Sequence, residues 1–200
     1  MSMAAEHGHM EIVKWLCDTM GVDVEGAMHR ALGVTCMGPC GLDPARNVEV
    51  ARFLLERGAK TSFCSAEQRE GEVEDAMFCD LINVAAQHGQ HLVLLELLLR
   101  DYRETTDKST ADALNSALKE AVEEQHDTRE PSYREAGRVK CAHLLLAFGA
   151  DPRALTLGTT ETALQCACTD ALRGALFDRA AVEAVKSSLV AGARGQAHPR

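Results

Sequence analysis

An amphipathic helix pattern recurs five times along the chain, and this repetition constrains the fold more than any other feature. Five segments place apolar residues at i, i+3 and i+4 and usually end at glycine: HMEIVKWLCDTMG, NVEVARFLLERGA, QHLVLLELLLRDY, RVKCAHLLLAFGAD and AAVEAVKSSLVAGA. A shorter helical pattern precedes each one, in MSMAAEHG, GAMHRAL, DLINVAAQHG, DALNSAL and TALQCAC. Because one such pair cannot bury its apolar face alone, the repetition predicts an all-α array in which neighbouring pairs cover each other.

The spacing of the pattern predicts inserted residues between its copies. With Ile12, Val50, Leu94, Cys141 and Ala184 at equivalent positions, the differences between successive residue numbers are 38, 44, 47 and 43. The composition suits packed helices, since 46% of the residues are hydrophobic and only 4% are aromatic. We therefore expect one domain over residues 1–200, with a shortened first unit. Its approximate units are 1–24, 25–61, 62–105, 106–153 and 154–195.

The shorter segments resemble the first helix of an ankyrin repeat, whose signature is TPLHxAAxxGH. The alanine pair and glycine of that signature recur as Ala4, Ala5 and Gly8, and as Ala85, Ala86 and Gly89. The family's proline is absent throughout. The resemblance implies an ankyrin-type α-solenoid of about five helix-loop-helix repeats with long inserted loops. The wide spacing leaves a solenoid of the tetratricopeptide or HEAT type as the alternative.

Two further signature positions carry polar replacements. The histidine of the Leu-His pair survives as His29 and is replaced by Asn83, Asn115 and Gln165, which keep hydrogen-bonding side chains. Where the family starts its helix with threonine, this chain has side chains that accept hydrogen bonds from the first helical turn. We expect these to be N-caps: Asp80, Asp112 and Thr162.

Insertions are expected between the two helices of units two, four and five, as loops of about ten or more residues or as extra helical turns. They separate Ala31 from Val50, Ala117 from Cys141, and Ala167 from Ala184. The longest, residues 123–138, alternates in charge and is predicted to be solvated. A further acidic insertion covers residues 65–76. Inserted loops on one face can build a binding surface, but surface loops also tolerate changes in length, and both interpretations stay open.

The eight cysteines divide into two groups. Cys17, Cys141, Cys166 and Cys168 fall on or beside the apolar positions and are predicted to be small core residues. The other four surround the insertions and offer an alternative function, a thiol-based metal site or redox sensor. Their spacing lacks the paired short knuckles of common zinc modules, so no metal is predicted, nor is one at His7 and His9. This second group is Cys36, Cys40, Cys64 and Cys79.

Charge and motifs exclude several classes of function. The net charge of −9 and pI of about 5.4 repel nucleic acid and anionic membranes. The longest apolar run, residues 91–100, is too short to span a bilayer. With no secretory signal in the opening residues, a cytoplasmic location is expected, the nucleus being left open. HExxH, GxSxG and phosphate-loop motifs are missing, so neither an enzyme nor a cofactor is predicted.

The resemblance implies a non-catalytic scaffold or adaptor that binds another protein, of unstated identity, on its concave face. The shortened first unit leaves open that the chain is part of a longer repeat array. The candidate residues are the variable positions after the alanine pair, together with one hairpin tip, and we expect Gln87, His88, Lys119 and Glu120 among them to be exposed. In unit two those positions are Gly33 and Val34. The binding residues expected elsewhere are Glu6, His7, Gln87, His88, Lys119, Glu120, Gly158, Thr159, Thr160, Thr169 and Asp170.

Overall fold

The computed structural model describes residues 1–19, 24–37, 44–59, 81–88, 95–100, 110–123, 131–155 and 160–195. Regular structure within these ranges is helical, apart from one isolated antiparallel bridge between Leu155 and Thr162. The predicted all-α class is therefore confirmed.

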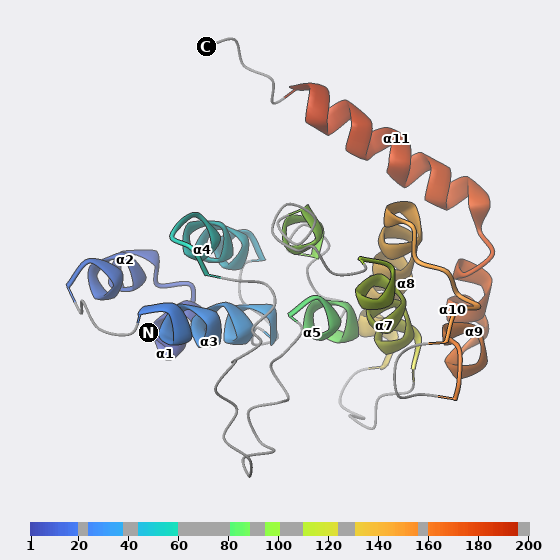
Figure 1. The fold of residues 1–200 in the computed structure, drawn as a ribbon, viewed down its shortest axis with the longest axis horizontal. Helices are drawn as coiled ribbons and strands as arrows, with labels where there is room; N and C mark the ends of the chain where they lie inside the picture. Colours follow the sequence, from blue (N-terminus) through green and yellow to red (C-terminus); the bar gives the residue numbers. More distant parts are fainter. Residues whose placement is uncertain are drawn as a thin grey trace.

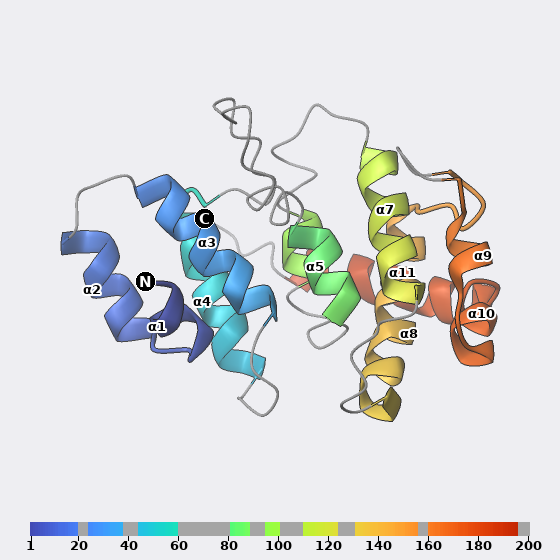
Figure 2. The same cartoon turned by 90° about the horizontal axis from the view of Figure 1, so that it is seen from below.

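The helices form two rows along the long axis of the molecule (Figure 1). In the first row, each helix contacts the next, as the view from below also shows (Figure 2). This row contains α1 (Ser2–Glu6), α3 (Val24–Met37), α5 (Leu81–His88), α7 (Thr110–Val122) and α9 (Ala163–Cys166). The second row contains α2 (Met10–Thr19), α4 (Pro44–Glu56), a helical stretch over 95–100, and α8 (Pro131–Phe148). Helices α10 (Asp170–Ala175) and α11 (Arg179–Gly195) both pack against α8.

The core lies between the rows and between successive helix pairs. Small side chains such as Ala31, Ala86 and Ala117 are fully buried and let the first-row helices approach closely. Leu54, Leu98 and Leu145 are also fully buried, as their positions in the repeated pattern predict. Leu189 was expected to be buried like them, but it is only half-buried because α11 has a helical neighbour on one side only within the described chain.

Two second-row helices end in the same glycine turn. Gly58 and Gly149 have φ angles of 95° and 106°, a region that side chains other than glycine rarely adopt. The N–H of Gly149 donates to the carbonyl of Leu146 at 3.1 Å, and the next N–H, of Ala150, donates to the carbonyl of Leu145 at 3.0 Å. Residues around Gly58 repeat this pattern with bonds of 2.9 Å. These paired bonds define a Schellman motif, and they confirm the predicted helix ends.

Within the described residues, the insertions of units two, four and five are mostly helical, and the acidic insertion over 65–76 lies outside those residues. Helix α3 continues to Met37, α10 lies in the insertion of unit five, and α8 starts at Pro131, inside the segment predicted to be solvated. Proline suits the first helical position because it has no N–H to leave unpaired. Arg138 is buried, and its Nε donates to the carbonyl of Ala121 at 2.7 Å while Nη2 donates to that of Glu123. The prediction of a solvated stretch is therefore wrong at Arg138, because this side chain satisfies carbonyls at the end of α7, whereas Ala136 in the same stretch is exposed.

The three expected N-caps have different outcomes. Thr162 is a cap: its hydroxyl accepts from the N–H of Gln165, whose amide oxygen accepts from the N–H of Thr162 at 2.8 Å. This is a capping box. Asp112 is not a cap, since α7 already begins at Thr110 and places this carboxylate inside the first turn, where the helix dipole favours negative charge. Asp80 lies outside the described residues.

Candidate partner-binding surface

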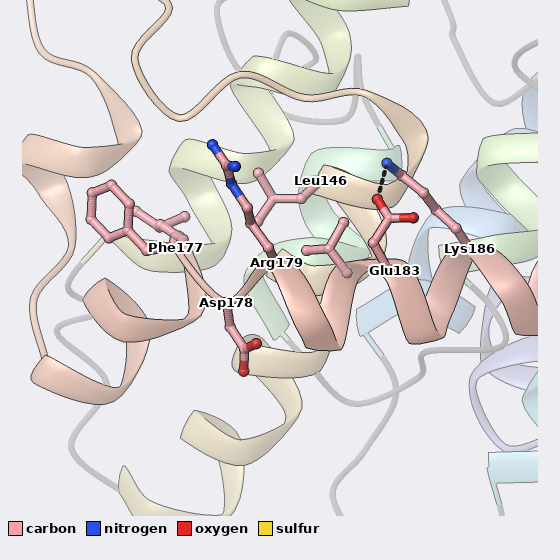
Figure 3. Close-up of a pocket in the computed structure, with 8 residues that line it drawn as sticks. Leu146, Phe177, Asp178, Arg179, Glu183 and Lys186 are labelled. Carbon is pink, nitrogen blue, oxygen red and sulfur yellow. Dashed lines mark hydrogen bonds and ion pairs between the residues drawn. The ribbon is translucent and has the colours of Figure 1, made fainter.

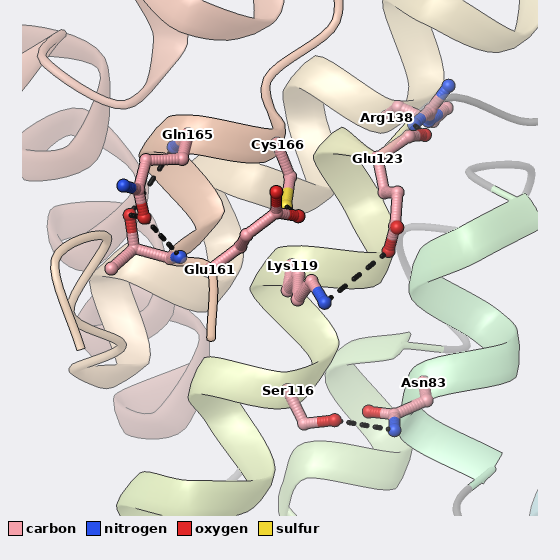
Figure 4. A network of polar contacts seen from close by, with 9 residues as sticks. Asn83, Ser116, Lys119, Glu123, Arg138, Glu161, Gln165 and Cys166 are labelled. Carbon is pink, nitrogen blue, oxygen red and sulfur yellow. Dashed lines mark hydrogen bonds and ion pairs between the residues drawn. The ribbon is translucent and has the colours of Figure 1, made fainter. Parts of the chain in front are cut away.

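Amide side chains connect the first row of helices to their neighbours. Asn83 on α5 donates from Nδ2 to the hydroxyl of Ser116 on α7 at 2.9 Å (Figure 4). Oδ1 of Asn115 accepts from the backbone N–H of Asp151, beyond the end of α8, at 2.7 Å. Both residues occupy the position of the signature histidine, and the equivalent His29 is buried. Hydrogen bonding at this position, expected from the sequence, is confirmed, and it fixes the spacing of successive helices.

Three pairs of the expected binding residues lie at equivalent places in the first row. Glu6 ends α1 and His7 follows it, Gln87 and His88 end α5, and Lys119 and Glu120 lie near the end of α7. His7 is exposed, whereas Glu6 and Gln87 are half-buried. The side chain of His88 lies outside the described part. We call these six residues the row-end strip.

Lys119 and Glu120 are less exposed than the sequence suggests. The side chain of Lys119 is only 13% exposed, and its ammonium lies 3.9 Å from the carboxylate of Glu123. Glu120 is half-buried. The expectation that both are freely exposed is wrong, because α8 and α9 pack against α7. Polar side chains surround this part of the strip in Figure 4.

The partial burial of Glu120 changes its acidity. Burial is the main cause that raises the pKa of Glu120 above its usual value, and the nearby carboxylate of Glu123 raises this pKa further. The positive charges of Lys119 and Arg138 oppose the shift without cancelling it. Glu120 is thus a carboxylate that pays a desolvation cost in the folded chain, and a cationic group placed beside it by a partner would relieve that cost.

The expected residues at the α9–α10 end have mixed outcomes. Thr160 and Asp170 are exposed, and Asp170 pairs with Arg173 at 3.2 Å. Thr169 is half-buried, and its hydroxyl accepts from the N–H of Leu172 at 3.2 Å, so this side chain caps α10. In unit two, Gly33 is buried inside α3 and presents no surface to a partner, because that helix extends beyond it. Val34 is half-buried, and Gly158 and Thr159 lie outside the described residues.

Of the cysteines that the structure describes, some are buried as predicted and others are not. Cys141 is buried as expected, Cys17 and Cys166 are half-buried, and Cys168 is exposed because it lies between α9 and α10 rather than on a packed helix face. Cys36 was expected in a loop, but it is buried in α3.

Burial also controls the chemistry of these thiols. It raises the pKa of both Cys36 and Cys141 to about 12, which opposes the thiolate form needed for metal binding or redox exchange. The remaining candidate ligands, Cys40, Cys64 and Cys79, lie outside the described residues. Within the described ranges, no group of three or more His, Cys, Asp or Glu side chains is arranged to hold a metal ion.

A pocket at the opposite end of the array was not expected from the sequence (Figure 3). Its volume is about 390 Å³, and it lies between the end of α8, the end of α10 and the start of α11. Leu146, Leu176, Phe177 and Val182 line it together with four charged residues. The pocket forms where three segments meet, and a repeated pattern does not show which segments pack together. The sequence indicated only the start of α11, because Asp178 is a helix-capping residue: its carboxylate accepts from the N–H of Ala181 at 3.0 Å.

The charged residues of the pocket are not equivalent. Lys186 pairs with Glu183 at 2.8 Å, and Asp178 caps α11. The guanidinium of Arg179 has no hydrogen-bond or ion-pair partner in the described part of the chain. The pocket therefore combines apolar walls with one unpaired positive charge.

None of the helices in the described ranges has the length and apolar character needed to cross a membrane. A comparison of the chain with known protein families, curated proteins and solved structures finds no match.

Proposed function

We propose that this chain is an ankyrin-type repeat module that binds another protein through its row-end strip. The observation that carries the proposal is the continuous first row, in which successive helices contact each other and three of them, α1, α5 and α7, place polar residues at corresponding positions. The shared Schellman turns and the amide hydrogen bonds at the signature histidine position support the ankyrin-type assignment.

A rigid row suits recognition because little conformational freedom is lost when a partner binds. The Asn83–Ser116 and Asn115–Asp151 hydrogen bonds hold neighbouring helices at fixed spacing, so the strip is organised before binding. Modest contacts distributed over α1, α5 and α7 then add up to useful affinity. We assign no catalytic role to the strip.

The charges around Glu120 indicate which kind of partner side chain would bind at the α7 part of the row-end strip. Two cations lie near Glu120, but Lys119 is paired with Glu123 and the guanidinium of Arg138 donates to backbone carbonyls. A lysine or arginine of the partner would compensate the half-buried Glu120 carboxylate, and such charge-assisted contacts are among the stronger hydrogen bonds. The proposed partner surface is therefore polar, with a basic side chain opposite Glu120.

Affinity capture followed by hydrogen exchange tests the proposal. Partners captured by the full chain are identified by mass spectrometry, and amide exchange is then compared in the free and bound chain. We expect the partner to slow exchange at residues 85–88 and 117–122, near the strip. Slower amide exchange confined to the second-row helices α4 and α8 would contradict the proposed site.

A further inference from the structure

Six large apolar side chains in the described part of the chain are at least half exposed. Met3, Ile12 and Trp15 lie on α1 and α2 at one end of the helix array, Leu155 and Phe177 lie toward the other end, and Val190 lies farther along α11. Figure 1 shows α2 and the α10–α11 junction at opposite ends of the long axis. Exposed apolar side chains gathered on one face of a protein mark interaction sites, and Ile12 and Trp15 lie one helical turn apart on α2.

Equivalent residues inside the chain show how such a face is normally covered. Ile12 is 50% exposed, whereas Val50 and Cys141, at the same position of the repeated pattern, are fully buried. Trp15 is 62% exposed, whereas the equivalent Leu144 is buried. The internal helices α4 and α8 have helical neighbours on both sides of the array. The outer face of α2 thus has the apolar character of a surface that another helical unit covers.

The other end of the array contains a pocket that complements the exposed Trp15 face of α2. The pocket beside Phe177 has apolar walls and enough volume for a large side chain, and the unpaired Arg179 lies in its lining (Figure 3). On α2, Glu11 lies one helical turn before Trp15, so both project from the same side of that helix. The carboxylate of Glu11 pairs with Lys14 at 3.0 Å, but both side chains are exposed, and such a pair is weak enough to exchange its partner. A helix that inserts Trp15 into the pocket therefore brings the Glu11 carboxylate toward the unpaired guanidinium of Arg179.

The charge of the two ends also differs. Residues 1–19 contain three acidic and one basic side chains, with histidine counted as neutral, whereas residues 170–195 contain three acidic and four basic ones. The second segment is therefore net positive in a chain of net charge −9. Two copies of the acidic end would repel each other, but the acidic end of one copy attracts the basic end of another.

We infer that the chain associates head to tail, with the Trp15 face of one copy docked in the Phe177 pocket of a second copy. This heterologous contact covers Trp15 of one copy and Phe177 of the other at once, and it places Glu11 of the first copy near Arg179 of the second. The inference does not depend on the row-end strip, which remains free for another partner.

Sedimentation velocity and tryptophan fluorescence test the association together. Trp15 is the one tryptophan in the chain, so its emission reports directly on this face. As the concentration of the 21.6 kDa chain rises, we expect the average mass to increase and the emission to shift to shorter wavelength. Trp15→Gln and Phe177→Gln should each keep the helical circular dichroism signal but lose self-association, because both side chains are exposed.

Mixing the two variants identifies the geometry of the contact. Trp15→Gln keeps an intact pocket and Phe177→Gln keeps an intact Trp15 face, so the mixture should form a dimer and the emission of Trp15 should shift. Val190→Gln, a change farther along α11 and outside the pocket lining, should associate like the parent chain. The charge pair is tested in the same way: Glu11→Arg should weaken association several-fold, and mixing it with Arg179→Glu should restore it.

Three results would overturn the inference. The parent chain could remain at the monomer mass at every concentration. Phe177→Gln alone could still dimerise while Trp15→Gln does not, which would indicate a symmetric contact between two Trp15 faces. The mixture of the two variants could also fail to form a dimer although both remain folded.

Discussion

Helices α2 and α4 carry the same repeated pattern but differ in burial. In α4, Val50 and Leu54 are fully buried, while in α2 the equivalent Ile12 is half exposed and Leu16 is half-buried. The apolar pattern is thus similar, and the difference lies in the neighbours that each helix has. Burial of the shared apolar pattern therefore depends on the helices that pack against it and not on the pattern alone.

The largest expected effect is on the free energy of unfolding, and it concerns one leucine position of the repeated pattern, occupied by Leu145 in the interior and by Leu16 at the end of the array. Leu145→Ala in α8 should lower the free energy of unfolding by about 2 to 5 kcal/mol, because it removes a fully buried side chain and leaves a cavity. Leu16→Ala in α2 should cost only about 1 kcal/mol, since part of that side chain is already in contact with water. Urea denaturation followed by circular dichroism measures both. Equal losses would show that neighbours do not set burial.

Arg138 tests whether the interior also depends on polar contacts between helices. Arg138→Ala should lower the free energy of unfolding by about 2 kcal/mol, because carbonyls at the end of α7 lose a charged donor. Lys140→Ala, two residues later on the same helix and exposed, should change it by less than about 0.5 kcal/mol. Thermal denaturation of the two variants makes the comparison. A stability for Arg138→Ala equal to that of Lys140→Ala would contradict the capping role.

Two glycines provide a smaller, opposite pair of effects. Gly149→Ala should destabilise the chain by about 1 to 2 kcal/mol, because alanine is strained at a φ of 106° although nothing blocks its Cβ. Gly174→Ala, inside α10 and exposed, should instead stabilise by about 0.5 to 1 kcal/mol through helix propensity. Denaturant midpoints measure both signs. A stabilising Gly149→Ala would show that the turn is not constrained.

The smallest expected effect concerns the pH dependence of Glu120. Because its folded pKa is raised above the ordinary value of 4.5, folding favours the protonated form. The associated penalty is present at pH values above the raised folded pKa, and it disappears as pH falls through that pKa toward the unfolded value. Glu120→Gln should therefore be slightly more stable than the parent at neutral pH, and this advantage should shrink in acid. Denaturation at pH 7 and pH 4 checks this; an advantage that grows in acid has the wrong sign.

Local sequence patterns predicted those features that depend on a few adjacent residues. The turns at Gly58 and Gly149, the capping box at Thr162 and the burial of Leu145 all follow from short-range rules. The sequence did not predict the burial of Arg138 or the partial burial of Lys119, since charged side chains are usually solvated. Both depend on where α8 packs against α7, a tertiary contact.

The candidate site was predicted in part. Sequence reasoning placed the row-end strip on equivalent helix ends, but it did not reveal that Thr169 caps α10 or that α3 extends past Gly33. The Phe177 pocket has no repeated counterpart from which to infer it, because α10 and its packing on α8 arise within an insertion. The repeated pattern thus predicts the features that the helix pairs have in common, but it does not predict a feature that occurs in one of them, such as α10.

Titration of a captured partner against two matched variants tests the proposed function most directly. One variant alters the row-end strip (His7→Ala, Gln87→Ala and Glu120→Gln), and the other alters exposed second-row residues (Glu49→Ala, Arg52→Ala and Lys140→Ala). Calorimetry should show the strip variant binding at least tenfold more weakly, a loss of about 1.4 kcal/mol, with unchanged affinity for the second-row variant. Unchanged affinity of a folded strip variant, with loss in the second-row variant, would contradict the account.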